Sequence, residues 1–257
     1  MNKVSMAIVA LLAAGVAQAS VILENDFGGA GVDIGPAFQD IRNAGSKKNS
    51  GSADPATGVV TGTEKFTTSG LASDSPVDVT SVNGAAGFTI EWVVESYSGN
   101  INDITLNGWF FGVTSGASAT HTTTEEEDDG SLFYNVEEAI GIVLYSGYHG
   151  NMQLYQRHDG GKATTALDAT APTKVSLEDG FTISLTVNND NTWSASSTGL
   201  STEINESGTL VGTSALYAYV ADSLIANTSI QAIGRYTVDK VTVTAIVPPS
   251  GSFISIK

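Results

Sequence analysis

The chain has 257 residues, of which 41% are hydrophobic, 8% aromatic and 15% charged, and it contains no cysteine. A hydrophobic fraction of this size supports a packed core and excludes a wholly disordered chain, and the missing thiols exclude thiolate metal sites and cysteine nucleophiles. The 27 acidic residues outnumber the 11 lysines and arginines and give a formal net charge of −16, so nucleic acid and anionic lipid are disfavoured as partners because both repel an acidic surface.

The first 19 residues have the three parts of a secretory signal peptide. Lys3 gives a basic start, an apolar run follows at 7–14, and small residues lead to Ala19. The apolar run is shorter than the about 20 residues that a membrane-spanning helix needs. We therefore expect a cleaved signal peptide at 1–19, a secreted or cell-surface protein, and no membrane span in the mature chain.

Alternation of apolar and polar residues, the pattern of half-buried strands, recurs along the rest of the chain. The ranges expected as strands are 88–95, 104–106, 109–113, 140–145, 152–157, 181–187, 192–196, 217–220, 230–234 and 238–246. The Asn and Asp residues at 188–191 predict a tight hairpin. Trp92, Trp109 and Trp193 fall on apolar faces and are expected in the core. Many short strands with little helix predict an all-β, antiparallel two-sheet sandwich.

The limits of this sandwich follow from composition. No shift in composition divides 20–247, which we expect to be a single β-sandwich domain. Within it, the polar and weakly periodic stretch 42–70 predicts either a long surface loop or a pair of edge strands. Pro248 and Pro249 cannot continue a hydrogen-bonded ladder, so 248–257 is expected to be a flexible C-terminal tail.

Catalytic motifs are sparse. A glycosidase needs two carboxyl groups about 5–9.5 Å apart, whereas Glu91 and Glu95 are four residues apart on one strand, or about 13 Å between Cα atoms. No G-x-S-x-G or H-E-x-x-H motif occurs, and His121, His149 and His158 lack metal-site spacing. The wide separation of the two glutamates and the absence of these motifs favour a non-catalytic protein. The alternative is a polysaccharide-degrading hydrolase or lyase whose carboxylates come from different strands.

An acidic run occupies 125–129. Its ordinary interpretation is a solvated loop, because neighbouring like charges repel one another. Calcium binding is the alternative, since calcium takes six to eight oxygen ligands, with Glu125, Glu127 and Asp129 as the candidate ligands. Calcium is the one cofactor that the sequence suggests.

Polar and aromatic residues gather around the expected hairpin 140–158. Alternation places Gln153, Tyr155 and Arg157 on one face of its second strand. Aromatic rings bind the apolar C–H edges of sugars, and amide and guanidinium groups supply hydrogen bonds to the hydroxyls. A tyrosine pair that only stabilises the hairpin is the alternative. The candidate carbohydrate-binding residues are Tyr145, Tyr148, His149, Gln153, Tyr155 and Arg157.

The segments 87–92, 107–112, 179–194 and 238–243 are similar to the early strands, central hairpin and last strand of one family. The chain resembles the concanavalin A-like (LamG-type) jelly-roll domains of secreted bacterial proteins. Many of these carry a PEP-CTERM sorting signal, of which 247–250 keeps only an incomplete version without its Glu. The resemblance implies a jelly-roll fold, which hosts lectins, adhesins, glycosidases and lyases. The signal peptide, the strand pattern, the hairpin residues and the missing acid pair favour a sandwich that binds an extracellular polysaccharide or cell-surface glycan, or contributes to a surface matrix.

Overall fold

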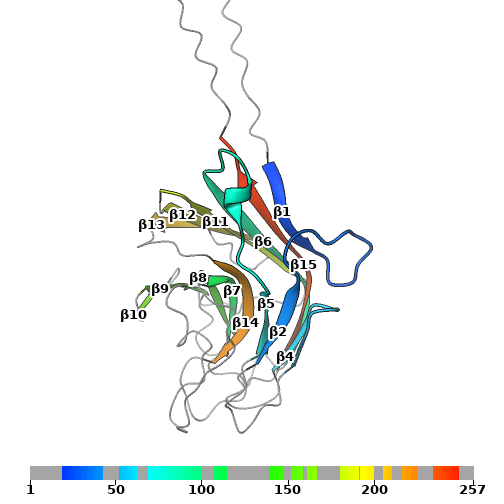
Figure 1. Ribbon diagram of the computed structural model, residues 1–257. Coiled ribbons are helices and arrows are strands. Elements are labelled where there is room, and N and C mark those ends of the chain that lie inside the picture. Colours follow the sequence, from blue (N-terminus) through cyan, green and yellow to red (C-terminus); the bar gives the residue numbers. More distant parts are fainter. Residues whose placement is uncertain are drawn as a thin grey trace, which may run out of the picture.

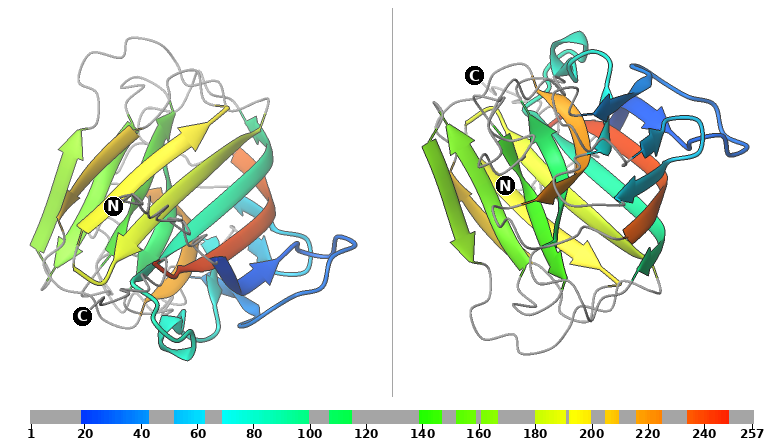
Figure 2. Two further views of the ribbon diagram at one scale, coloured as in Figure 1. Left: turned by 90° about the horizontal axis from the view of Figure 1, so that it is seen from above. Right: turned by 90° about the horizontal axis from the view of Figure 1, so that it is seen from below.

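In the computed structural model, the described residues form two antiparallel β-sheets packed face to face, and the predicted all-β sandwich is confirmed (Figures 1 and 2). Among these residues the helical part is one short 3-10 helix, η1 (Val79–Ser81). The described ranges are 19–42, 52–62, 69–99, 107–114, 139–146, 152–158, 161–166, 180–190, 192–199, 205–209, 216–224 and 234–248.

The first sheet, sheet A, has eight strands, seven of them in the order β13-β12-β11-β6-β15-β4-β3 and the eighth, β1, paired with β15. Strand β15 pairs with β6 along one edge, and its other edge is shared by β4 and β1. The strands are β1 (Ala19–Asn25), β3 (Ser52–Asp54), β4 (Val59–Gly62), β6 (Gly87–Gly99), β11 (Phe181–Asn188), β12 (Thr192–Thr198), β13 (Asn205–Thr209) and β15 (Gly234–Ile246).

The second sheet, sheet B, has seven strands in the order β10-β9-β8-β7-β14-β5-β2. Strand β14 lies between β7 and β5, so elements distant in sequence become neighbours in the sheet. The strands are β2 (Phe38–Arg42), β5 (Ser69–Ser73), β7 (Asn107–Thr114), β8 (Ala139–Ser146), β9 (Met152–His158), β10 (Gly161–Ala166) and β14 (Tyr217–Leu224).

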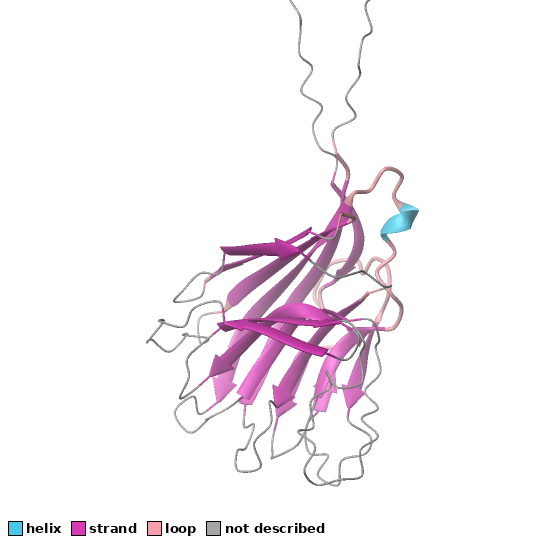
Figure 3. Ribbon diagram, turned by 90° about the vertical axis from the view of Figure 1, so that its left-hand side faces the viewer, coloured by secondary structure: helices cyan, strands magenta, loops and turns pink. Residues whose placement is uncertain are grey.

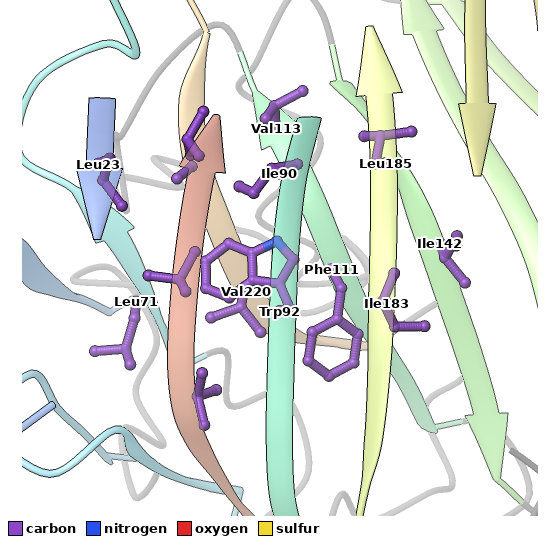
Figure 4. Close-up of a cluster of buried hydrophobic side chains, with 14 of the residues drawn as sticks. Leu23, Leu71, Ile90, Trp92, Phe111, Val113, Ile142, Ile183, Leu185 and Val220 are labelled. Atoms are coloured by element: carbon purple, nitrogen blue, oxygen red, sulfur yellow. The ribbon is translucent and has the colours of Figure 1, made fainter. Parts of the chain in front are cut away.

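The core lies between the sheets and follows the alternation of their strands. Along β11 every second residue is buried, beginning with Phe181. Trp92 on β6 belongs to the same buried cluster as Phe111 and Val220 of sheet B (Figure 4). Trp92 and Trp193 are both buried, as predicted, whereas the side chain of Trp109 lies outside the described residues. Large rings therefore provide much of the contact between the layers.

The polar stretch 42–70 contains a pair of edge strands, one of the two structures that the sequence predicted for it. Strands β3 and β4 pair with each other, and β4 extends sheet A beside β15. Ala53 and Val60 turn into the core and are buried. The alternation is weak in sequence because these strands have only three and four residues. The expected strand at 104–106 lies outside the described residues.

Candidate functional site

The outer face of sheet B, the face turned away from sheet A, is the surface on which the candidate carbohydrate-binding residues fall. On β14, Ala218 and Val220 belong to the core between the sheets. Tyr219 lies between them in the strand, so strand alternation turns it to the outer face. Tyr219 is in register with Gly112 of β7, and Gly112 is in register with Gly141 of β8.

The same row reaches the predicted binding hairpin. Tyr155 of β9 pairs with Gly141, and Gln153 and Arg157 occupy the alternate positions on either side of Tyr155. Tyr145 of β8 pairs with Gly108 of β7 and, four residues from Gly141, shares its strand face. Four of the six candidate residues therefore take positions on one face of two neighbouring strands.

The other two candidates, Tyr148 and His149, lie outside the described residues. So do the proposed calcium ligands Glu125, Glu127 and Asp129. Among the residues that the structure describes, no group of three or more histidine, aspartate or glutamate residues is placed to hold a metal ion. The described part of the chain also has no helix long and apolar enough to cross a membrane.

The centre of the outer face of sheet B is buried. Four residues on this face are at most 2% exposed: Ile41, Ala72, Thr114 and Tyr219. Sheet A cannot provide this cover, because it packs on the opposite side of sheet B. Burial raises the pKa of the Tyr219 hydroxyl well above 10.0, so this phenol is neutral at physiological pH. The Tyr219 side chain is therefore inaccessible to a ligand.

Sequence reasoning missed the role of Tyr219. It identified the strand at 217–220, and the alternation Tyr-Ala-Tyr was a signal that one side of this strand differs from the other. Burial on both sides could not be read from that signal, because the outer-face neighbours Ala72 and Gly112 come from strands far away in sequence.

The carboxylates considered for catalysis lie elsewhere. Glu91 and Glu95 are exposed on β6, and Ile90, Trp92 and Val94, which alternate with them, are core residues. Both acids therefore face outward from sheet A. Ser184 Oγ of β11 donates a hydrogen bond to Glu91 Oε2 at 3.2 Å. This part of sheet A is a surface of hydroxyl and carboxylate groups, continued by Thr89 and Thr186, whose Oγ1 atoms are 2.8 Å apart.

A groove that the sequence did not predict lies at one end of the sandwich. Its volume is about 1120 Å³, and it is lined by the start of β1, by 34–36 and by 75–82, which includes η1. Figure 3 shows η1 at this end of the molecule. The lining comes from segments far apart in sequence, and no periodic pattern marks it.

Solved structures of lectins resemble this chain in fold. The basic winged bean lectin with Tn-antigen matches with a TM-score of 0.56 and 10% identity, over 90% of this chain and 100% of that chain. Lectin II from Ulex europaeus gives a TM-score of 0.56 and 10% identity, over 88% and 100% of the two chains. The carbohydrate recognition domain of Emp47p matches with a TM-score of 0.51 and 13% identity, over 89% of this chain and 97% of that chain.

No family model matches the sequence, and no curated protein matches it. Identities this low establish architecture alone, because one fold hosts many functions. The chain has the concanavalin A-like jelly-roll fold of the legume lectins.

Proposed function

We propose that this chain is an exported, non-catalytic carbohydrate-binding β-sandwich. Its ligand is an extracellular polysaccharide or cell-surface glycan, held at the β8–β9 part of the outer face of sheet B. The strand register supports this location, because it brings Tyr145 of β8 to the same face as Gln153, Tyr155 and Arg157 of β9.

The chemistry of these residues suits a sugar. The rings of Tyr145, Tyr148 and Tyr155 offer faces for the C–H edges of a pyranose. The amide of Gln153, the guanidinium of Arg157 and the imidazole of His149 offer hydrogen bonds to its hydroxyls. Calcium held by Glu125, Glu127 and Asp129 is a further part of the proposal, since bound calcium can order a loop through several oxygen ligands.

Two further observations support the proposal. Several proteins of similar fold are lectins, one of them solved with galactose and another with Tn-antigen. The segment 1–19 has the composition of a signal peptide, which agrees with export to a compartment where extracellular glycans are available.

The test is binding of the purified protein to a glycan array, followed by titration calorimetry with the best ligand. We expect Tyr155→Ala and Arg157→Ala each to weaken binding about tenfold or more, the effect of losing about 1.4 kcal/mol. Ser196→Ala is the matched control, because Ser196 is exposed on β12 of the other sheet. Chelation of calcium tests the metal separately.

Three results would overturn the proposal. The first is an array without any retained glycan. The second is a ligand whose affinity neither substitution changes, which would move the site elsewhere. The third is release of reducing sugar or unsaturated product from a polysaccharide, which would establish the enzyme alternative.

A further inference from the structure

The groove at the end of the sandwich opens onto the hydrophobic core. Val77, Phe88, Val187 and Leu216 form its floor, and all four belong to the buried cluster between the sheets. Its volume of about 1120 Å³ is slightly above the range of about 300–1,000 Å³ typical of ligand pockets. An apolar ligand in this groove would continue the packing of the core.

Exposed apolar side chains form one wall of the groove. Val21 of β1 is 40% exposed and Ile34 is 43% exposed, and both line the groove. In the part of the chain that the structure describes, the third large exposed hydrophobic residue is Val32, which is 79% exposed and does not line it. Exposed apolar groups gathered beside a cavity mark a surface that binds something.

Three polar side chains that line the groove are engaged within the protein. Asn188 Nδ2 donates to Thr192 Oγ1, and Asn189 Nδ2 donates to the carbonyl of Ala85, each at 2.9 Å. Asp78 Oδ1 accepts from the backbone N–H of Thr80 at 2.9 Å and from its hydroxyl at 2.6 Å. With these groups already paired, the groove is better suited to an aliphatic chain than to a sugar.

Backbone hydrogen bonds between different elements fix the shape of the groove. The N–H of Val77 donates to Leu216 O at 2.7 Å, the N–H of Ala86 donates to Ile246 O at 2.8 Å, and the N–H of Asn189 donates to Ala86 O at 2.8 Å. These bonds join segments that belong to both sheets. A groove formed before its ligand arrives loses less entropy on binding.

The charge at the groove sets the headgroup that its ligand can carry. Among the described residues that line the groove, Asp78 has the charged side chain. The hydroxyl and then the N–H of Thr80 lower the pKa of Asp78 below 3.8, so this carboxyl is ionised at neutral pH. The net charge of −16 on the whole chain adds to the negative potential and repels anionic headgroups.

We propose that this groove binds the aliphatic chain of a free single-chain amphiphile with an uncharged or cationic headgroup. The site is separate from the proposed glycan site. Leu216 precedes one end of β14, whereas Ser223 near the other end is in register with Gly108 and, through it, with Tyr145. The two sites can therefore be tested independently.

The test is calorimetric titration of the full-length protein with three octyl compounds, each below its micelle concentration. These are tetraethylene glycol monooctyl ether, octyltrimethylammonium and octyl sulfate, none of which contains a sugar. We expect saturable binding of the first two and at least about tenfold weaker binding of octyl sulfate, a difference of about 1.4 kcal/mol.

Two substitutions test the location. Val21→Glu and Ile34→Glu each place a charge in the apolar wall and are expected to weaken binding of the octyl ether by about tenfold or more, since burying an unpaired charge is costly. Val32→Glu is the matched control and should leave the affinity unchanged, because Val32 is exposed but does not line the groove. Circular dichroism of each variant confirms that the fold is retained.

Each of the other outcomes contradicts the proposal. Absence of binding excludes the ligand class, and equal binding of all three octyl compounds excludes the charge argument. Unchanged affinity in a folded Ile34→Glu variant excludes the location. Association with phosphatidylcholine vesicles, but not with the monomeric octyl ether, assigns the surface to a membrane instead.

Discussion

Lys240 Nζ lies 2.9 Å from Glu24 Oε1, and this ion pair joins β15 to β1. Glu24 also exchanges two backbone hydrogen bonds with Ile34, at 2.8 and 2.9 Å. Glu24 therefore connects the segment that carries Ile34 to β1, and the backbone ladder between β1 and β15 holds Val21 beside it at sheet A.

Substitution Lys240→Gln should destabilise the protein by less than about 1 kcal/mol, because partly exposed ion pairs contribute little in water. The two side chains are 38% and 26% exposed, so salt should screen most of their attraction. Urea denaturation of Lys240→Gln, of Glu24→Gln and of the double variant gives the coupling energy between the two side chains. A coupling above about 2 kcal/mol at physiological salt would contradict this estimate.

Gly58 and Gly84 both have positive φ angles, 63° and 77°, but differ in their surroundings. A Cβ at Gly84 would meet no atom within 4 Å, whereas one at Gly58 would collide with the carbonyl oxygen of Val238. Gly84→Ala should therefore cost only the backbone strain of about 1–2 kcal/mol. Gly58→Ala should cost clearly more, because β15 has to move. Thermal unfolding of the two variants makes the comparison, and equal losses would show that the close approach is unimportant.

Acid should weaken the fold through three aspartates. A hydrogen bond from the backbone N–H of Ala56 is the main cause that lowers the pKa of Asp54. The hydroxyls of Thr80 and Thr192 are the main cause that lowers the pKa of Asp78 and of Asp190, respectively. Because the folded-state pKa is below the unfolded value of 3.8, their contribution is present above pH 3.8 and is lost as pH falls through the lower folded values.

Asp190→Asn should flatten this acid dependence, because an amide does not titrate while its oxygen can still accept the N–H of Thr192. The measurement is the melting temperature of both proteins from pH 5 to about pH 2.5. Identical slopes for the variant and the parent would show that Asp190 does not contribute to the acid transition.

The hairpin between β11 and β12 could be predicted from sequence because its signals are local. Asn189 and Asp190 form its turn, and Asp190 Oδ1 accepts the N–H of Thr192 at 3.0 Å. The apolar alternation in both strands is regular, and the structure shows the same alternation in burial. The side-chain chemistry of the turn and the apolar periodicity of the two strands therefore predict the same hairpin.

The bounds and the pairing of the edge strands, and the groove, could not be predicted in this way. Val60 is buried because β4 pairs with the distant β15, and a four-residue strand is too short to show a period. The groove floor joins Phe88 with Val187 and Leu216, residues whose proximity depends on strand order. The register of β8 and β9, by contrast, agrees with the face predicted for Gln153 and Tyr155.

Alkali should destabilise the protein through Tyr219. Burial raises the folded-state pKa of this hydroxyl well above 10.0, so the phenol stays neutral when folded but ionises in the unfolded chain near pH 10. Its contribution to stability is therefore complete below pH 10.0 and declines as pH rises further. Tyr219→Phe should keep a larger share of its neutral-pH stability at about pH 11 than the parent protein does. Urea denaturation at both pH values, with tyrosinate absorbance recorded alongside, measures the difference. If the parent and Tyr219→Phe lose the same share, the alkaline transition comes from other groups among the eight tyrosines or the lysines.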